Sequence, residues 1–113
     1  MIVTAWNNGA HNRNGSGYGF KVHAADRDEF FKKEWKSIML EIEGEAEAVE
    51  IAIDPAHFWG ETIRELAHPA VGKWLRHNGL APWRVGNAPT FVLEPLSDNR
   101  FKLVKPAKGH PAF

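Results

Sequence analysis

The stretch Asn7–Gly19 (NNGAHNRNGSGYG) gathers four of the chain's seven asparagines and four of its ten glycines. Asparagine and arginine can pair bidentately with adenine and guanine edges, and histidine can donate to bases or phosphates. Glycine lets the backbone approach a groove closely and adopt a positive φ. The loop therefore offers base-reading groups in Asn8, His11, Asn12 and Arg13, although ordinary turns also prefer asparagine and glycine.

The glycines of this loop do not match a nucleotide-binding or catalytic signature. A dinucleotide fingerprint needs G-x-G-x-x-G leading into a helix, whereas Gly15, Gly17 and Gly19 are spaced G-x-G-x-G and precede a strand-like run. A P-loop would need Gly-Lys-Ser/Thr, and a nucleophile elbow would need glycines in place of Asn14 and Tyr18. With three serines and no cysteine, the chain is poorly supplied for covalent catalysis. We predict no catalytic residue and no cofactor.

Six histidines raise the question of a metal centre. His57 and Glu61 lie four residues apart and His68 could join them, but Pro55 and Gly60 interrupt a continuous helix there. The chain has no H-E-x-x-H and no paired Cys/His ligand spacing. A metal-dependent hydrolase around these residues stays a third alternative, and no metal site is predicted.

The formal net charge is zero, but the charges are distributed unevenly. Residues 1–40 carry six basic and four acidic side chains, residues 41–70 carry one and eight, and residues 71–113 carry seven and two. The acidic side chains alternate along 41–47, so this segment could face a basic protein partner. Charge blocks of this kind are also common as solvated faces.

Length and composition indicate one globular domain over residues 1–113. The chain has 43% hydrophobic and 25% charged residues, and its 113 residues can bury a core without disulfides. The absence of cysteine excludes thiolate zinc sites and fits a reducing compartment. The N-terminus lacks the basic region of a signal peptide, and no apolar run approaches the ~20 residues of a membrane span. We therefore expect a cytoplasmic protein, complete from Met1, with no membrane segment.

Apolar residues alternate in six short runs, which predicts six strands. These runs are residues 2–6, 18–22, the two arms of a hairpin over 38–53, and residues 91–96 and 100–105. Asp54-Pro55 ends the 38–53 hairpin. Pro95 indicates that the 91–96 strand lies near a sheet edge.

Two segments have helical patterns. One begins at Asp26, which forms a capping box with Glu29, and runs to about Trp35. The other has an apolar stripe from residue 63 to residue 75, with Thr62 and Glu65 as possible caps. It is broken at His68 by Pro69, and Asn78-Gly79 ends it.

The order ββ-α-ββ-α-ββ with short connections predicts an α+β fold with a strongly bent, mainly antiparallel sheet of about six strands. The sheet would be closed or nearly closed into a small barrel, with two helical segments over its open ends. Residues 106–113 would form a loose tail. We place Trp74 in the core, whereas Trp59 and Trp83 lie in loops, where a ring could stack on a base or cover the core edge.

The element order and the stretch NGLAPWRVGNAPTFVLEPLSDNRFKL, residues 78–103, resemble the DNA-binding pseudobarrel superfamily. This group includes plant B3 domains and the effector-type DNA-recognition domains of some restriction endonucleases. The resemblance implies a bent open barrel whose loop arms enter the major groove, with residues 7–17 as the N-terminal arm. The neutral total charge and the acidic hairpin depart from this pattern, so both would have to face away from DNA.

We therefore predict a non-catalytic nucleic-acid-binding module, with duplex DNA as its partner. Its base-reading groups would lie in the 7–17 loop, and four cations would contact phosphates: Lys21, Lys36, Arg84 and Lys102. The alternative is a protein-interaction or accessory module that uses the acidic hairpin over residues 41–50. The oligomeric state and any DNA sequence preference do not follow from the sequence.

Overall fold

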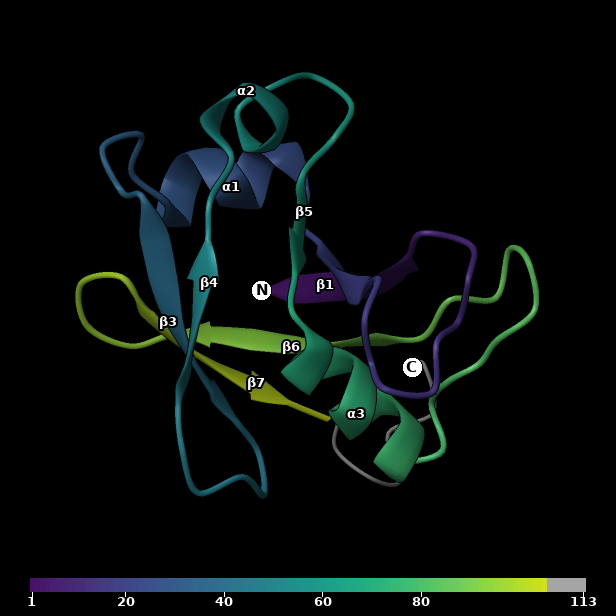
Figure 1. Ribbon diagram of the computed structural model, residues 1–113. Coiled ribbons are helices and arrows are strands. Elements are labelled where there is room, and N and C mark those ends of the chain that lie inside the picture. Colours follow the sequence, from purple (N-terminus) through teal and green to yellow (C-terminus); the bar gives the residue numbers. More distant parts are fainter. Residues whose placement is uncertain (106–113) are drawn as a thin grey trace.

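The computed structural model describes residues 1–105 and contains one seven-stranded mixed sheet and three helices (Figure 1). The strands are β1 (Ile2–Asn7), β2 (Tyr18–Lys21), β3 (Ser37–Ile42), β4 (Val49–Ala52), β5 (Glu65–Ala67), β6 (Thr90–Pro95) and β7 (Arg100–Val104). The helices are α1 (Ala24–Phe30), α2 (Pro55–Phe58) and α3 (Pro69–His77). The predicted α+β class and barrel-like sheet are confirmed, with one strand more than expected. The predicted tail, residues 106–113, lies outside the described residues.

Three antiparallel hairpins build most of the sheet, in agreement with the mainly antiparallel pairing that was predicted. β1 pairs with β2, β3 with β4, and β6 with β7. A parallel pairing between β3 and β7 and an antiparallel pairing between β1 and β6 join the hairpins in the order β4-β3-β7-β6-β1-β2-β5. The edge strands β4 and β5 approach each other, so the sheet forms a nearly closed barrel. This closure leaves little exposed strand edge.

The inward-facing side chains of the strands form one apolar core. Phe31, which follows α1, stacks on Phe101 of β7 with ring centroids 4.7 Å apart. Trp74 of α3 is buried, as predicted, and its Nε1 donates to the carbonyl oxygen of Glu43 at 3.0 Å. This hydrogen bond joins α3 to the turn of the β3–β4 hairpin.

The helices cover different parts of the barrel. In Figure 1, α1 and α2 lie together above the strands, and α3 lies at the lower right of the view. The buried Arg27 of α1 donates from one nitrogen to the carbonyl oxygens of Phe58 at 2.9 Å and Gly60 at 2.6 Å, and its guanidinium lies over the partly buried ring of Trp59. Within residues 1–105, no helix has the length and apolar character needed to cross a membrane.

The helical pattern predicted over residues 63–68 is wrong. Glu65–Ala67 forms strand β5, which pairs with β2, and the helix begins only at Pro69. Leu66 is buried in the core, whereas Ile63 is 41% exposed. Pairing with the free edge of β2 outweighed the local helical period, which is a weak determinant in so short a segment. The predicted interruption at His68 is confirmed, since its backbone is extended at φ −160° and ψ 140°.

The predicted ends of the first helix are also wrong. Helix α1 begins after His23, which makes no side-chain cap hydrogen bond, so Asp26 lies inside the helix rather than at its N-cap. The helix ends at Phe30 instead of continuing to Trp35. The next residue, Phe31, turns to an extended backbone and is buried against the core aromatics. Burial of this ring explains the early end of the helix.

Strand β6 is central, between β7 and β1, so its predicted place near a sheet edge is wrong. Pro95 is tolerated because it is the last residue of β6 and pairs only with Phe101 of β7, since β1 begins opposite Val92.

The predicted end of α3 at Asn78-Gly79 is confirmed. Gly79 has φ +71°, and the amide of Leu80 donates back to the carbonyl oxygen of Leu75, as in a Schellman motif.

Candidate nucleic-acid interface

The loop between β1 and β2 is held in shape by its own asparagines. Oδ1 of Asn7 accepts the amide hydrogens of Gly9 at 2.7 Å and His11 at 3.2 Å. The amide of Asn8 donates to the carbonyl oxygen of Gly17 at 2.9 Å, which closes the base of the loop. Side-chain acceptors of this kind replace backbone partners in turns, and this accounts for part of the unusual composition.

The tip of the loop follows the same principle. Nδ2 of Asn12 donates to both the carbonyl oxygen and the hydroxyl oxygen of Ser16, and Oδ1 of Asn14 accepts the amide hydrogen of Ser16 at 3.0 Å. Arg13 lies between these asparagines and is exposed. Its side chain makes no hydrogen bond or ion pair with the other residues in the described range 1–105. The loop thus presents Arg13 from an ordered turn.

Helix α3 anchors the loop to the barrel. Arg76 donates from Nε to the carbonyl oxygen of Asn12 at 3.1 Å and from a second nitrogen to the carbonyl oxygen of His11. Its guanidinium also lies 5.7 Å from the ring centroid of Tyr18. A single cation thereby satisfies two loop carbonyls and packs on a buried aromatic ring.

Two glycines let the loop and the helix touch. A Cβ placed on Gly72 of α3 would lie 2.6 Å from Gly15 Cα and 2.7 Å from the ring of Tyr18. Gly15 itself has φ +88°, which L side chains rarely adopt. Both positions therefore require glycine, and the contact between them sets the distance between the loop and α3.

An aromatic cluster stands where the loop meets the segment between α3 and β6. Nδ1 of His11 lies 2.8 Å from the hydroxyl oxygen of Tyr18, and the ring of Trp83 packs edge-on against both rings. Trp83 is partly buried against the core. It thus covers the core edge, one of the two roles considered from the sequence.

Beside this cluster is a shallow hollow, which we call the Trp6–Trp83 hollow. Its volume is about 330 Å³, in the range of small ligand sites. Its lining consists of Ala5, Trp6, Asn7, Gly9, His11, Trp83, Val85 and Gly86. Among the described residues, the lining therefore combines two tryptophans, one histidine and one asparagine amide, with no charged carboxylate or amine.

One polar atom at this hollow has no partner. Nδ2 of Asn7 is buried and makes no hydrogen bond to any residue in the described part of the chain. A buried donor without an acceptor costs about 1–3 kcal/mol. Because this atom is covered, an acceptor in the hollow would reach it only after a neighbouring side chain moved aside.

Acidic residues are excluded from the segments that build this end of the molecule. All fourteen lie in residues 26–65 and 94–98, so residues 1–25 and 66–93 contain none. These two acid-free segments form β1, the 8–17 loop, β2, α3, Trp83 and most of β6, and they carry five of the fourteen Lys and Arg residues. Nearby carboxylates come from the β3–β4 hairpin, where Glu45 shares a hollow with Lys73 and His77. The loop face is therefore cationic although the whole chain is neutral.

The predicted base-reading residues lie together on the loop, but three of the four are partly occupied. Oδ1 of Asn8 accepts the amide hydrogen of Ala10, and Nδ2 of Asn12 is bound to Ser16. Bidentate pairing with adenine uses both ends of an amide. His11 is bound to the hydroxyl group of Tyr18. Of the four residues, only Arg13 has a polar end without a hydrogen-bond partner in the described chain.

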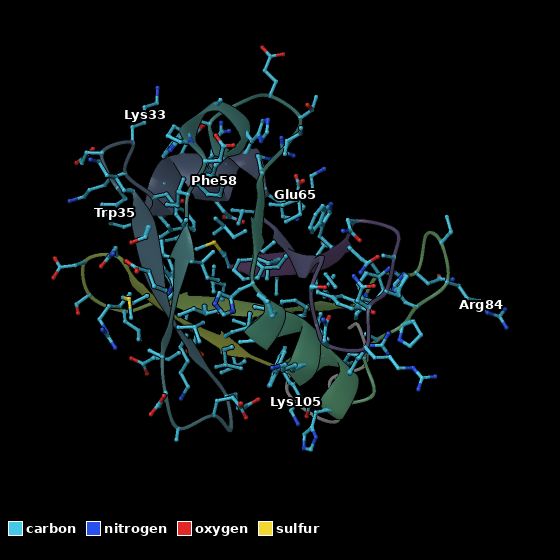
Figure 2. The ribbon with its side chains drawn as sticks, viewed as in Figure 1. Lys33, Trp35, Phe58, Glu65, Arg84 and Lys105 are labelled. Atoms are coloured by element: carbon cyan, nitrogen blue, oxygen red, sulfur yellow. The ribbon has the colours of Figure 1, made fainter. Side chains whose placement is uncertain are left out.

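The predicted phosphate contacts are spread over the molecule. Figure 2 shows Arg84 at the loop end, far from Trp35, the chain neighbour of Lys36. Lys21 lies in register with Glu65 of β5. Lys102 of β7 has Glu41 and Glu94 in register on its two neighbouring strands. The structure thus brings Arg84 toward the loop and leaves the three lysines elsewhere.

Sequence reasoning missed Trp6 and Asn7 as lining of the hollow. The strand alternation holds the signal, because Val3 and Ala5 are buried and Trp6 therefore faces outward. The absence of acidic residues from 1–25 and 66–93 is a second signal in the sequence. Charge sums over residues 1–40, 41–70 and 71–113 conceal it, because each of these ranges also contains acidic residues.

The residues considered for a metal site do not come together. His57 pairs with Asp54 at 3.0 Å, whereas Nδ1 of His68 accepts the amide hydrogen of Ala70 and caps α3. Within residues 1–105, no group of three or more His, Cys, Asp or Glu side chains is placed to hold a metal ion.

Comparison with known proteins gives no match to a family model, a curated protein or a solved structure. The resemblance to the pseudobarrel superfamily therefore stays a prediction, and any function has to be argued from the geometry of the chain itself.

Proposed function

We propose that this protein is a non-catalytic module that binds duplex DNA through the end of the barrel carrying the 8–17 loop. The observation that supports this most strongly is the exclusion of every acidic residue from the two segments that build this end. Phosphate contacts supply a large share of the affinity of DNA-binding proteins, so a face built mainly from acid-free segments is favourable for approach to the backbone. The exposed cations of these segments are Arg13, Lys73 and Arg84.

The ordered loop adds a second argument. Its turns are closed by internal hydrogen bonds and its underside is fixed to α3 by Arg76. A loop ordered before binding loses little conformational freedom when it enters a groove. Arg13 at its exposed tip is the side chain suited to the O6 and N7 atoms of guanine.

The acidic hairpin is less suited to be the main binding surface. Glu41 pairs with Arg100 at 3.3 Å, and Glu50 accepts the hydroxyl hydrogen of Ser37 at 2.8 Å. Glu43 accepts the backbone amide of Lys105. Three of the five acidic side chains in residues 41–50 therefore already have partners within the chain.

The test is fluorescence anisotropy with mixed-sequence duplex DNA, single-stranded DNA and RNA. We expect the duplex to bind best and its affinity to fall roughly 10- to 40-fold between about 50 and 200 mM salt, as two to three phosphate contacts would require. Arg13→Ala should weaken binding by about 1–3 kcal/mol and relax any sequence preference. The matched control is Lys32→Ala, which removes an exposed cation from the turn after α1.

Two results would contradict the proposal. The first is the absence of duplex binding at low salt, in which case a protein partner for the hairpin becomes the better hypothesis. The second is an equal loss of affinity in Arg13→Ala and Lys32→Ala, which would mean that the protein attracts DNA without using this face.

A further inference from the structure

We infer that the Trp6–Trp83 hollow receives a single unstacked nucleobase of the bound nucleic acid. The inference rests on the proposed function, because it names the part of the DNA that this same end of the barrel would contact. It also goes beyond that function, since duplex binding by the loop requires no base to leave the stack.

The lining of the hollow suits a flat aromatic ring. Trp6 comes from β1 and Trp83 from the segment between α3 and β6, so indole rings from two distant parts of the chain border the same space. Aromatic side chains are the usual platforms on which unstacked bases lie. The bordering Gly9 and Gly86 carry no side chains that would narrow the entrance.

The polar groups of the hollow suit the edge of a base. Nδ2 of Asn7 is a buried donor without a partner, while Oδ1 of the same amide is fixed by Gly9 and His11. The amide is therefore held in one orientation, and an acceptor on a base edge would satisfy its Nδ2 once a covering side chain moved aside. A polar group beside the hollow that lacks a partner in the described chain distinguishes the site from a purely apolar docking patch.

The surrounding charge favours a base over a cationic guest. Aromatic hollows also bind ammonium groups, but such a ligand would find no carboxylate in the two segments that build this end, which carry Arg13 and Arg84. A nucleotide combines a neutral ring with an anionic phosphate, and these cations could lie against that phosphate. Val85 at the rim is fully exposed and is placed to contact the neighbouring sugar or base.

The test compares three duplexes that differ at one central position and uses the unmodified chain. One duplex is fully paired, one has a mismatched base pair, and one has abasic sites at both opposed positions. A mismatched base leaves the stack more easily than a paired one, whereas the doubly abasic duplex is also deformable there but offers no unpaired base. We expect the mismatched duplex to bind about tenfold more tightly than both of the others, as one base–aromatic stack would give.

The variant arm uses Trp83→Leu, with Trp35→Leu as the matched control at a partly buried tryptophan elsewhere. Circular dichroism establishes that each variant is folded. Trp83→Leu should abolish the preference for the mismatch, whereas Trp35→Leu should keep it.

The outcomes separate the two proposals. Equal binding of the mismatched and abasic duplexes, or of all three, would overturn the base-binding inference and leave duplex binding standing. A mismatch preference that survives in folded Trp83→Leu would overturn it as well. Failure to bind any of the three at low salt would overturn duplex binding itself, and the inference with it.

Discussion

Replacement of Gly72 by alanine tests the contact that positions the 8–17 loop. In an exposed helix this change is stabilising by about 1 kcal/mol, because alanine is the better helix former. At Gly72 the added Cβ would lie 2.6 Å from Gly15 Cα, 2.7 Å from the ring of Tyr18, and closer still to the carbonyl oxygen of Gly15. The two effects oppose each other, so the sign of the measured change decides between them.

The steric effect should win. A Cβ essentially never approaches a neighbour closer than 3.0 Å, so α3 and the loop must separate by at least about 0.4 Å. The obstructing atoms at Gly15 belong to the backbone, and the loop is also fixed by Arg76, so no flexible side chain can move aside there. Overpacking of this kind costs about 1–3 kcal/mol or more, and with backbone atoms this close the cost should exceed the roughly 1 kcal/mol gained in helix propensity.

The assay is urea unfolding followed by circular dichroism. We expect Gly72→Ala to lower the free energy of unfolding by about 1–2 kcal/mol net, with the slope against urea unchanged. A comparison of Lys73→Gly with Lys73→Ala, at the next and exposed position, measures the propensity effect in the same helix. If Gly72→Ala is as stable as the wild type or more stable, the close contact between α3 and the loop is refuted.

Three further changes probe the supports of the loop and of α3. Arg76→Lys should lower the free energy of unfolding by about 1–2 kcal/mol, because an ammonium group cannot reproduce the guanidinium contacts with two carbonyls, and amide hydrogen exchange in residues 8–17 should become faster. His68→Ala should cost about 1 kcal/mol by removing the cap of α3, and His68→Asn should restore most of it in thermal melts. Trp74→Phe keeps a buried ring but leaves the carbonyl of Glu43 without its donor, so urea unfolding should show a loss of about 1–2 kcal/mol. An unchanged stability in any of these variants would contradict the corresponding hydrogen bond.

The sequence was sufficient for the hairpins because their signals are local. Alternation of apolar residues and a turn between two runs are properties of neighbouring positions, and all three hairpins follow them. How the hairpins join is not local. Nothing in the sequence of β3 or β7 selects the parallel pairing that connects them, because that choice depends on which edges meet as the sheet closes.

Strand β5 also could not be predicted from its local sequence, because it forms by pairing with a distant strand. Leu66 and Ala67 continue the apolar spacing of Val71 and Trp74, so the sequence pattern alone favours one helix. Pro69 indicates a break, but only the unpaired edge of β2 decides that the residues before it become a strand. Three residues are too few to show a period of their own.

The candidate site was predictable in its loop and not in its hollow. The loop is visible in composition, since asparagine and glycine cluster within a few positions. The hollow is formed by residues about 80 positions apart, Trp6 and Trp83, and their proximity follows from the pairing of β1 with β6. The cationic end likewise becomes visible only when the fold brings together two acid-free segments.

The asparagines and the arginine of the loop have different roles in this arrangement. Asn12 cannot offer its Nδ2 group to a base without giving up its contacts to Ser16, and Asn14 holds the same turn through its Oδ1 atom. Arg13 has no such internal contact in the described chain, so its use in recognition costs no loop structure. Sequence discrimination by this loop should therefore depend on Arg13 much more than on Asn12. A loss of loop order in Asn12→Ala that leaves the preferred DNA sequence unchanged would follow from this division, and a changed preference would contradict it.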